Sequence, residues 1–157
     1  MKKIRIYVDT SVIGGCRDPE FETWSQGMLS DFQKGFFMLL LSSLTDAEIQ
    51  DAPYEVKEVY KEFRNCDHEF IELNPESIEL ADAYLKQNII PVSFRNDAQH
   101  ISMATASGAD ILLSRNFKHI VNFEKIQRFN AVNLDMGYKP IAIYSPREVT
   151  TYGRESS

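Results

Sequence analysis

The segment 36–42 (FFMLLLS) is almost entirely apolar and is the strongest constraint on the fold. A strand with one face in water alternates apolar and polar residues, whereas a strand buried on both faces is apolar throughout. Strands of the second kind occur in parallel sheets that helices cover on both sides. Even with its extension to Leu44, the run is far shorter than the ~20 residues of a membrane-spanning helix. The segment therefore predicts a buried strand of an α/β protein, and no membrane span is expected.

Four other short segments have the composition of strands, and segments with helical spacing separate them. The first, 3–9 (KIRIYVD), alternates and is rich in β-branched residues. The clearest helix lies within 17–35, where Asp18 suits the N-cap, Pro19 the first helical position and Gly35 the end. The other expected strands are 68–73, 111–114 and 140–145, and the other expected helices are 43–50, 54–65, 75–87, 96–107 and 120–129.

Strands that alternate with helices indicate an α/β sandwich around a mainly parallel, five-stranded sheet. The 157 residues fit one domain, expected to span residues 1–150, with 151–157 as a flexible tail. The amino terminus carries two lysines, but its alternation and the early Asp9 are unlike a signal peptide. A cytoplasmic protein is therefore expected.

The formal net charge of −6 is mild evidence against binding nucleic acid through phosphate contacts alone. It does not exclude a nuclease, because a metal site is itself built from acids. Arg95, Arg115, Lys118 and His119 are candidates for a local basic rim. The two cysteines have no metal-ligand spacing and are expected to be free thiols, so a structural zinc site is not expected.

Four polar side chains are predicted at the carboxyl edge of the sheet, where parallel α/β proteins bind ligands. Asp9 closes the first strand, and Asn116 follows the fourth strand by two residues. Glu48 lies in the helix that leaves the second strand, and Asp97 begins the helix that leads into the fourth. Whether these side chains meet depends on the strand order, which residue spacing leaves open.

Each of the four residues also has a purely structural explanation. Asp9 can simply end a strand, and Asn116 suits a turn. Glu48 completes a capping-box pattern with Thr45. Asp97 lies in the first turn of a helix, where an acid suits the helix dipole. Their convergence on one edge shifts the balance toward a functional site.

A cation is the natural partner of these residues, because clustered carboxylates repel one another. Oxygen ligands without cysteine or paired histidine favour Mg²⁺ or Mn²⁺. Such an ion lowers the pKa of a bound water and stabilises charge in an in-line displacement at phosphorus. Phosphodiester hydrolysis is therefore the reaction class that suits the four residues best.

Other α/β enzymes are disfavoured by missing motifs. The sequence contains neither G-x-x-x-x-G-K-[ST] nor G-x-G-x-x-G, and it lacks the G-x-S-x-G nucleophile elbow. An aspartyl-phosphate phosphatase would carry a second Asp two positions after the first, where Ser11 stands.

Three segments resemble the PIN-domain family of metal-dependent nucleases, which includes the VapC-like toxins of toxin–antitoxin pairs. They are YVDTSVI (7–13), LLSSLTDAEI (40–49) and NDAQHISMATASGADILLSRNFKHI (96–120), and the resemblance runs from about Ile4 to Val149. The resemblance implies a three-layer α/β/α sandwich and a homodimer.

The resemblance also assigns roles to the edge residues. Asp9, Glu48 and Asp97 match the family's acids, and Asn116 stands where the family commonly has Asp, so one negative charge is missing. The resemblance implies that Asp9 and Asp97 are the main ligands of Mg²⁺ or Mn²⁺, with Glu48 and Asn116 completing the set of ligands. The expected supporting residues are Thr10, Ser11, His100 and Ser114, and the candidate contacts to RNA phosphate are Arg115 and Lys118.

The activity that the resemblance implies is endonucleolytic cleavage of RNA by a metal-activated water. The chain would then be an endoribonuclease and a candidate toxin of such a pair, with an antitoxin as its candidate protein partner. A first alternative is a PIN-like RNA- or protein-binding module whose nuclease activity is weakened or lost. A second is a nuclease for RNA maturation or for DNA that has no antitoxin.

Overall fold

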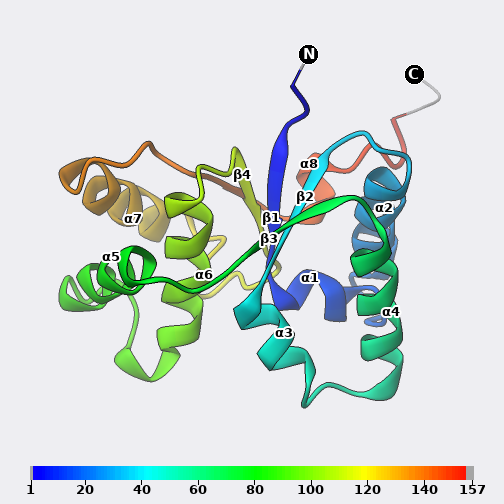
Figure 1. Cartoon of the computed structure of the whole chain (residues 1–157), viewed down its shortest axis with the longest axis horizontal. Helices are drawn as coiled ribbons and strands as arrows, with labels where there is room; N and C mark the ends of the chain where they lie inside the picture. The colour runs from blue at the N-terminus through cyan, green and yellow to red at the C-terminus, as the bar shows by residue number, and fades with distance from the viewer. Residues whose placement is uncertain (1, 155–157) are drawn as a thin grey trace.

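Five parallel strands form the centre of the molecule, and helices cover both faces of the sheet (Figure 1). The computed structural model describes residues 2–154. The strand order is β3-β2-β1-β4-β5, and every neighbouring pair is parallel. The expected three-layer α/β/α sandwich is therefore confirmed. The strands are β1 (Arg5–Val8), β2 (Met38–Ser42), β3 (His68–Ile71), β4 (Ile111–Leu113) and β5 (Ala142–Tyr144).

The helices divide into two layers. One face of the sheet carries α5 (Pro75–Lys86), α6 (Arg95–Ala106) and α7 (Phe123–Asp135), with the short turn η1 (Val92–Phe94) before α6. The other face carries α1 (Thr10–Gly15), α2 (Glu22–Gln33), α4 (Tyr54–Asn65) and α8 (Pro146–Val149). The remaining helix, α3 (Ser43–Ile49), continues directly from β2 at the carboxyl edge.

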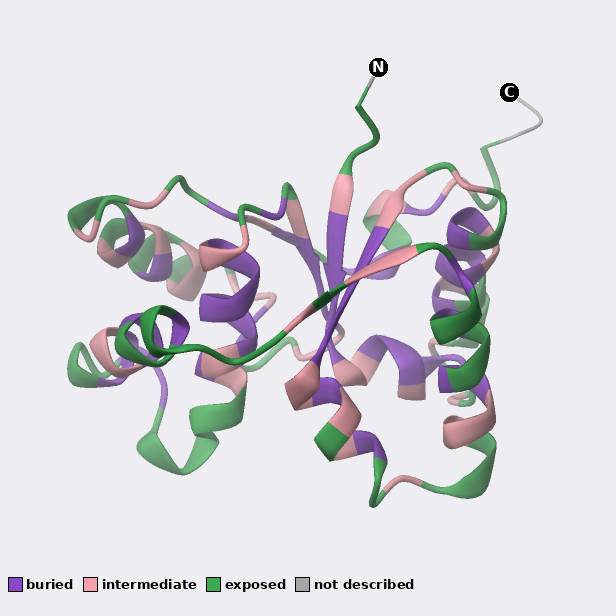
Figure 2. Ribbon diagram, in the orientation of Figure 1, coloured by how far each residue is buried: buried purple, intermediate pink, exposed green. Residues whose placement is uncertain are grey.

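Two hydrophobic cores fill the space between these layers. Ile6 and Val8 of β1 belong to the core beneath α2 and α4, whereas Tyr7 points into the core beneath α5 and α6. All three side chains are fully buried, and Figure 2 shows β1 and β2 as buried along most of their length, whereas β3 at the edge of the sheet is intermediate to exposed. β1 is therefore held from both sides, which fixes the position of the residues that follow it.

The first long helix begins later than its sequence pattern predicts. α2 starts at Glu22, so the expected start with Asp18 as N-cap and Pro19 at the first position is wrong. Asp18 instead forms a turn: its side chain accepts from the Glu20 N–H, and its carbonyl accepts from the Phe21 and Glu22 N–H groups. The expected end is confirmed, because Gly35 follows the helix with φ +77°.

The carboxyl-terminal segment packs against α2. The buried Asp31 carboxylate accepts hydrogen bonds from the hydroxyl of Thr150 and the backbone N–H of Thr151. The ring of Tyr152 lies edge-on to Trp24, with centroids 5.8 Å apart. These contacts involve the first residues of the expected tail, and its last three residues, 155–157, lie outside the described part of the chain.

Within residues 2–154, the helices are too short or too polar to cross a lipid bilayer.

Candidate nuclease site at the carboxyl edge

The strand order places the predicted edge residues beside one another. β1 lies between β2 and β4, so Asp9 is adjacent both to the helix after β2 and to the loop after β4. The chain builds the sheet outward from β1 to β3 and then crosses to β4 and β5 on the opposite side. The carboxyl ends of β1 and β4 are therefore the point where the strand order reverses, and open α/β sheets bind ligands at this point.

Asp9 is a buried carboxylate at the end of β1, with 3% of its surface exposed. It is the N-cap of α1 and accepts hydrogen bonds from the Ser11 hydroxyl (2.6 Å) and the Val12 backbone N–H (3.3 Å). Burial raises the pKa of Asp9, and the charge of nearby His100 and the Ser11 hydrogen bond oppose that effect only in part. A bound cation would therefore stabilise the ionised carboxylate.

Glu48 reaches from α3 toward α1 and α6. Its carboxylate accepts hydrogen bonds from Thr10 Oγ1 (2.6 Å) and from His100 Nε2 (2.7 Å). Burial alone would raise the pKa of Glu48, but the His100 and Thr10 hydrogen bonds outweigh burial and lower the pKa. Glu48 is therefore ionised at neutral pH and contributes negative charge to the edge.

The capping-box explanation of Glu48 is wrong. The N-cap of α3 is Ser42, whose hydroxyl accepts a hydrogen bond from the Thr45 backbone N–H at 3.2 Å. Thr45 therefore lies inside the helix, and Glu48 follows the first turn. Its carboxylate contacts other segments and does not cap its own helix.

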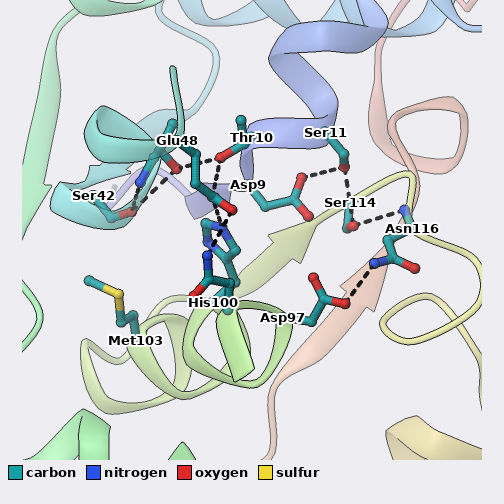
Figure 3. Close-up of polar contacts among 12 residues, drawn as sticks. Asp9, Thr10, Ser11, Ser42, Glu48, Asp97, His100, Met103, Ser114 and Asn116 are labelled. Atoms are coloured by element: carbon teal, nitrogen blue, oxygen red, sulfur yellow. Dashed lines mark hydrogen bonds and ion pairs between the residues drawn. The ribbon is translucent and has the colours of Figure 1, made fainter. Parts of the chain in front are cut away.

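His100 is buried between Glu48 and the central strand. Its Nδ1 lies 2.8 Å from the Tyr7 hydroxyl, which donates to Ser42 Oγ at 2.8 Å. Burial raises the pKa of Tyr7, so the hydroxyl keeps its proton at neutral pH. A chain of polar contacts thus runs from Ser42 through Tyr7 and His100 to Glu48. It fixes the orientation of the Glu48 carboxylate, which lies beside His100 in Figure 3.

Asp97 lies in the first turn of α6 and has two partners from the loop after β4. Its Oδ2 accepts a hydrogen bond from Asn116 Nδ2 (3.2 Å) and lies 2.9 Å from His119 Nδ1. His119 is buried, and its ring packs against Phe94 with centroids 4.3 Å apart. His119 was expected only as part of a basic rim. The one signal for this contact was its position three residues after Asn116.

Asn116 closes a turn, as one of its two interpretations expects, and it also contacts Asp97. Its Oδ1 accepts from the His119 backbone N–H (3.0 Å), which closes the turn, while its Nδ2 donates to Asp97. Its own backbone N–H donates to Ser114 Oγ (3.0 Å), which lies 3.3 Å from the Ser11 hydroxyl. Polar contacts therefore run from Asp9 through the two serines to Asn116 and Asp97.

The two candidate RNA contacts have different surroundings. Arg115 donates from its backbone N–H to Ser11 Oγ (2.9 Å) and from Nε to the Ser11 carbonyl (2.7 Å), and it pairs with Asp18 at 3.5 Å. Lys118 is exposed, and its carbonyl accepts a bond from the Lys125 ammonium. Arg115 therefore borders the cluster closely, and Lys118 lies on the surface.

The donor set fits a divalent ion of the magnesium type. Among residues 2–154, no group of three or more histidine, cysteine or acidic side chains stands close enough to hold a metal by protein ligands alone. The carboxylates of Asp9 and Asp97 nevertheless point toward one another (Figure 3). Mg²⁺ commonly binds through one or two carboxylates and takes waters and substrate phosphate as its remaining ligands. An open site with two carboxylates is compatible with that coordination preference.

Asp9→Asn is expected to raise the thermal unfolding temperature in EDTA at pH 7.5. The raised pKa means that the folded state holds a proton at Asp9 more tightly than the unfolded state, so ionisation destabilises the fold above the ordinary value of 3.8. Asn keeps an acceptor for Ser11 and Val12 and removes the charge. Because 1 kcal/mol corresponds to about 2–4 °C in a domain of this size, a rise of a few degrees is expected.

The matched control for this prediction is Asp51→Asn, because Asp51 is exposed and lies in the turn after α3. Its unfolding temperature should stay close to that of the parent. The advantage of Asp9→Asn should disappear as the pH falls below the ordinary pKa of Asp. A lower unfolding temperature for Asp9→Asn at pH 7.5 would contradict this account of the buried charge.

Solved structures of similar fold come from protein complexes. One match is a chain of VapBC2 from Rickettsia felis, in a structure bound to a DNA fragment from the VapBC2 promoter. Its TM-score is 0.60 and its identity 15%, over 90% of this chain and 98% of the other. A chain of FitAcB from Neisseria gonorrhoeae matches with TM-score 0.56 and 14% identity over 92% and 99%. A chain of FitAB bound to the IR36 DNA fragment matches with TM-score 0.56 and 14% identity over 90% and 94%.

No protein-family model matches the sequence, and no curated protein is similar to it. At 14–15% identity, the likeness to solved structures establishes the fold. The chain therefore has the PIN-like α/β/α fold that the sequence resemblance implies.

Proposed function

We propose that this chain is a metal-dependent endoribonuclease of PIN type and the toxin of a toxin–antitoxin pair. One observation carries the proposal: the buried Asp9 and the helix-borne Asp97 point toward one another at the edge where the strand order reverses. A cation between two facing carboxylates from segments so distant in sequence would offset their repulsion. An RNA substrate, an antitoxin partner and a homodimer belong to this proposal.

Asp9 and Asp97 would hold Mg²⁺ or Mn²⁺. When bound, such an ion supplies positive charge at the phosphate and lowers the pKa of a water. The protein contributes carboxylates that are already oriented: Ser11 and the Val12 N–H hold Asp9, while Asn116 and His119 hold Asp97. Because these hydrogen bonds exist in the free protein, little reorganisation is needed when substrate arrives.

Glu48 would support the Asp9–Asp97 pair through its charge, without having to contact the metal itself. Its lowered pKa keeps it ionised, and its contact with the buried His100 holds it in place. The charge of Glu48 makes the edge more negative and strengthens its attraction for a divalent cation. This role requires charge and position and does not require direct contact with the metal.

The partner proposal draws on the fold neighbours. The VapBC2 and FitAB structures are complexes bound to DNA. The sequence resembles VapC-like toxins, and the fold neighbours include a complex of the VapBC kind. A small protein partner that binds this chain follows from that combination.

A second candidate function is a binding module without nuclease activity. The observation that favours it is the Asn116 amide, which donates a hydrogen bond to Asp97 where an acid could not. Together with His119, this amide satisfies the Asp97 Oδ2 without any metal. The cleavage experiment below separates the two functions.

Purified protein is expected to cut a mixed-sequence single-stranded RNA with Mn²⁺ or Mg²⁺ and to be inactive in EDTA. Asp9→Asn and Asp97→Asn should each lose at least about 100-fold in rate, because the loss of charge stabilisation at a reacting centre commonly costs that much. The matched control Asp51→Asn, an exposed acid outside the cluster, should cut like the parent. Metal-independent cutting, or cutting by both cluster variants at the parental rate, would refute the site.

Asn116→Asp is expected to make the protein more dependent on metal. The substitution removes the hydrogen bond to Asp97 and places two carboxylates in contact, so the unfolding temperature in EDTA should fall. Added Mn²⁺ should then raise the unfolding temperature by more than it raises that of the parent, and cleavage should require less Mn²⁺ for half-maximal rate. An equal shift by Mn²⁺ in both proteins would show that position 116 does not face the ion.

A further inference from the structure

A pocket of about 340 Å³ lies next to the candidate site, between the start of α2, the loop after β4 and the start of α8. Its volume is that of a small-ligand pocket. Aromatic rings and guanidinium groups make up much of its lining, with one acid among them. These lining residues are Phe21, Trp24, Phe117, Arg115, Arg147 and Glu20.

The rings and guanidinium groups of this pocket are stacked on one another. Phe21 and Phe117 lie nearly parallel, with centroids 6.1 Å apart and an interplanar angle of 27°. The Arg115 guanidinium lies 5.1 Å from the Phe21 centroid, and the Arg147 guanidinium lies 5.1 Å from that of Trp24. Phe117 is 48% exposed despite its size. The three rings therefore form an aromatic wall of the pocket, with guanidinium groups over Phe21 and Trp24 and with the Phe117 ring open to solvent.

Arg115 joins this pocket to the carboxylate cluster. Its Nε donates to the Ser11 carbonyl at 2.7 Å, and the Ser11 hydroxyl donates to Asp9 at 2.6 Å. Asn116, which contacts Asp97, lies in sequence between Arg115 and Phe117. Neighbouring nucleotides of one nucleic-acid strand could therefore occupy the carboxylate cluster and the pocket.

We propose that this pocket binds an unpaired base of single-stranded RNA, next to the phosphate that lies at Asp9 and Asp97. The inference rests on the proposed nuclease function and adds a binding site for a base of its RNA substrate. Bases stack on aromatic side chains and on arginine planes whatever their identity, and arginine also binds the adjoining phosphate. A base in a duplex is already stacked and paired, so it cannot enter such a pocket.

Charge favours RNA over a protein segment in this pocket. The chain as a whole has a net charge of −6, yet two arginines line the pocket against the single lining acid Glu20, and Asp18, which pairs with Arg115 at 3.5 Å, lies outside the lining. A nucleotide offers both a flat ring for the aromatic wall and a phosphate for the arginines. A peptide helix would require a longer apolar groove, whereas this pocket is compact and partly cationic.

Trp24 makes the proposal measurable, because it is the only tryptophan of the sequence. A short single-stranded RNA, titrated in EDTA so that no cleavage occurs, is expected to quench its fluorescence with saturation. Phe117→Leu and Arg147→Gln should each weaken binding at least about fivefold, since stacking contributes about 1–3 kcal/mol per base. Phe36→Leu is the matched control, because Phe36 is 49% exposed and lies outside the pocket lining.

The outcomes separate this proposal from the nuclease proposal. Asp9→Asn should still bind the RNA in EDTA, so intact binding without cleavage by the metal-loaded parent would refute the nuclease and leave the pocket standing. If Phe117→Leu and Arg147→Gln both cleaved RNA at the rate of the parent and bound it with the affinity of the parent, the base-binding role of the pocket would be refuted and the nuclease proposal would stand. Equal binding of a duplex, or quenching by an acidic helical peptide and not by RNA, would also overturn the proposal. Thermal unfolding of each variant checks its folding, and the exposed Arg147→Gln tests the pocket without altering the core.

Discussion

The arrangement of the site depends on the desolvation of Asp9. β1 is the central strand of the sheet and is buried on both faces, so the residue that follows it ends among other strands and out of water. Burial raises the pKa of this carboxylate, and the hydrogen bonds that it accepts do not cancel the effect. The protein thus retains a charge that destabilises it, as functional sites often do. A cation at the edge would convert that cost into binding affinity.

Buried histidines hold the two other acids of the cluster. His100 contacts Glu48 at 2.7 Å, and His119 contacts Asp97 at 2.9 Å. Each imidazole is fixed in turn by the protein, His100 through Tyr7 and His119 through its packing on Phe94. Such contacts orient a carboxylate in the way that groups behind a metal ligand orient it. The acids are therefore positioned before any ion or substrate binds.

The sequence predicts the fold well because its apolar runs are short and distinct. Strands such as 36–42 and helices such as 54–65 have unambiguous patterns, and the latter matches α4 (Tyr54–Asn65) at both ends. α1 was not predicted, because TSVIGG combines β-branched residues with two glycines, all weak helix formers. This helix forms because Asp9 caps it and because Val12 and Ile13 are buried, and both causes depend on tertiary structure.

The position of the four residues at one edge could also be predicted from the sequence, because the carboxyl ends of parallel strands meet at one edge. Their mutual contacts could not, because residue spacing does not determine strand order. The capping-box pattern at Glu48 was misleading because a local motif competes with long-range partners. Here Thr10 and His100 bind the carboxylate instead. His119 was missed as a partner of Asp97 because its one local signal, the position three residues after Asn116, does not distinguish it from an exposed basic residue.

The most direct test of the central claim is Mn²⁺ binding by the free protein, measured by electron paramagnetic resonance in the absence of RNA. The account predicts saturable binding by the parent that is lost in Asp97→Asn and weakened by Glu48→Gln, with folding checked by circular dichroism. Binding of the same strength and stoichiometry in the folded Asp97→Asn variant would contradict it, because the ion would then lie outside the Asp9–Asp97 pair.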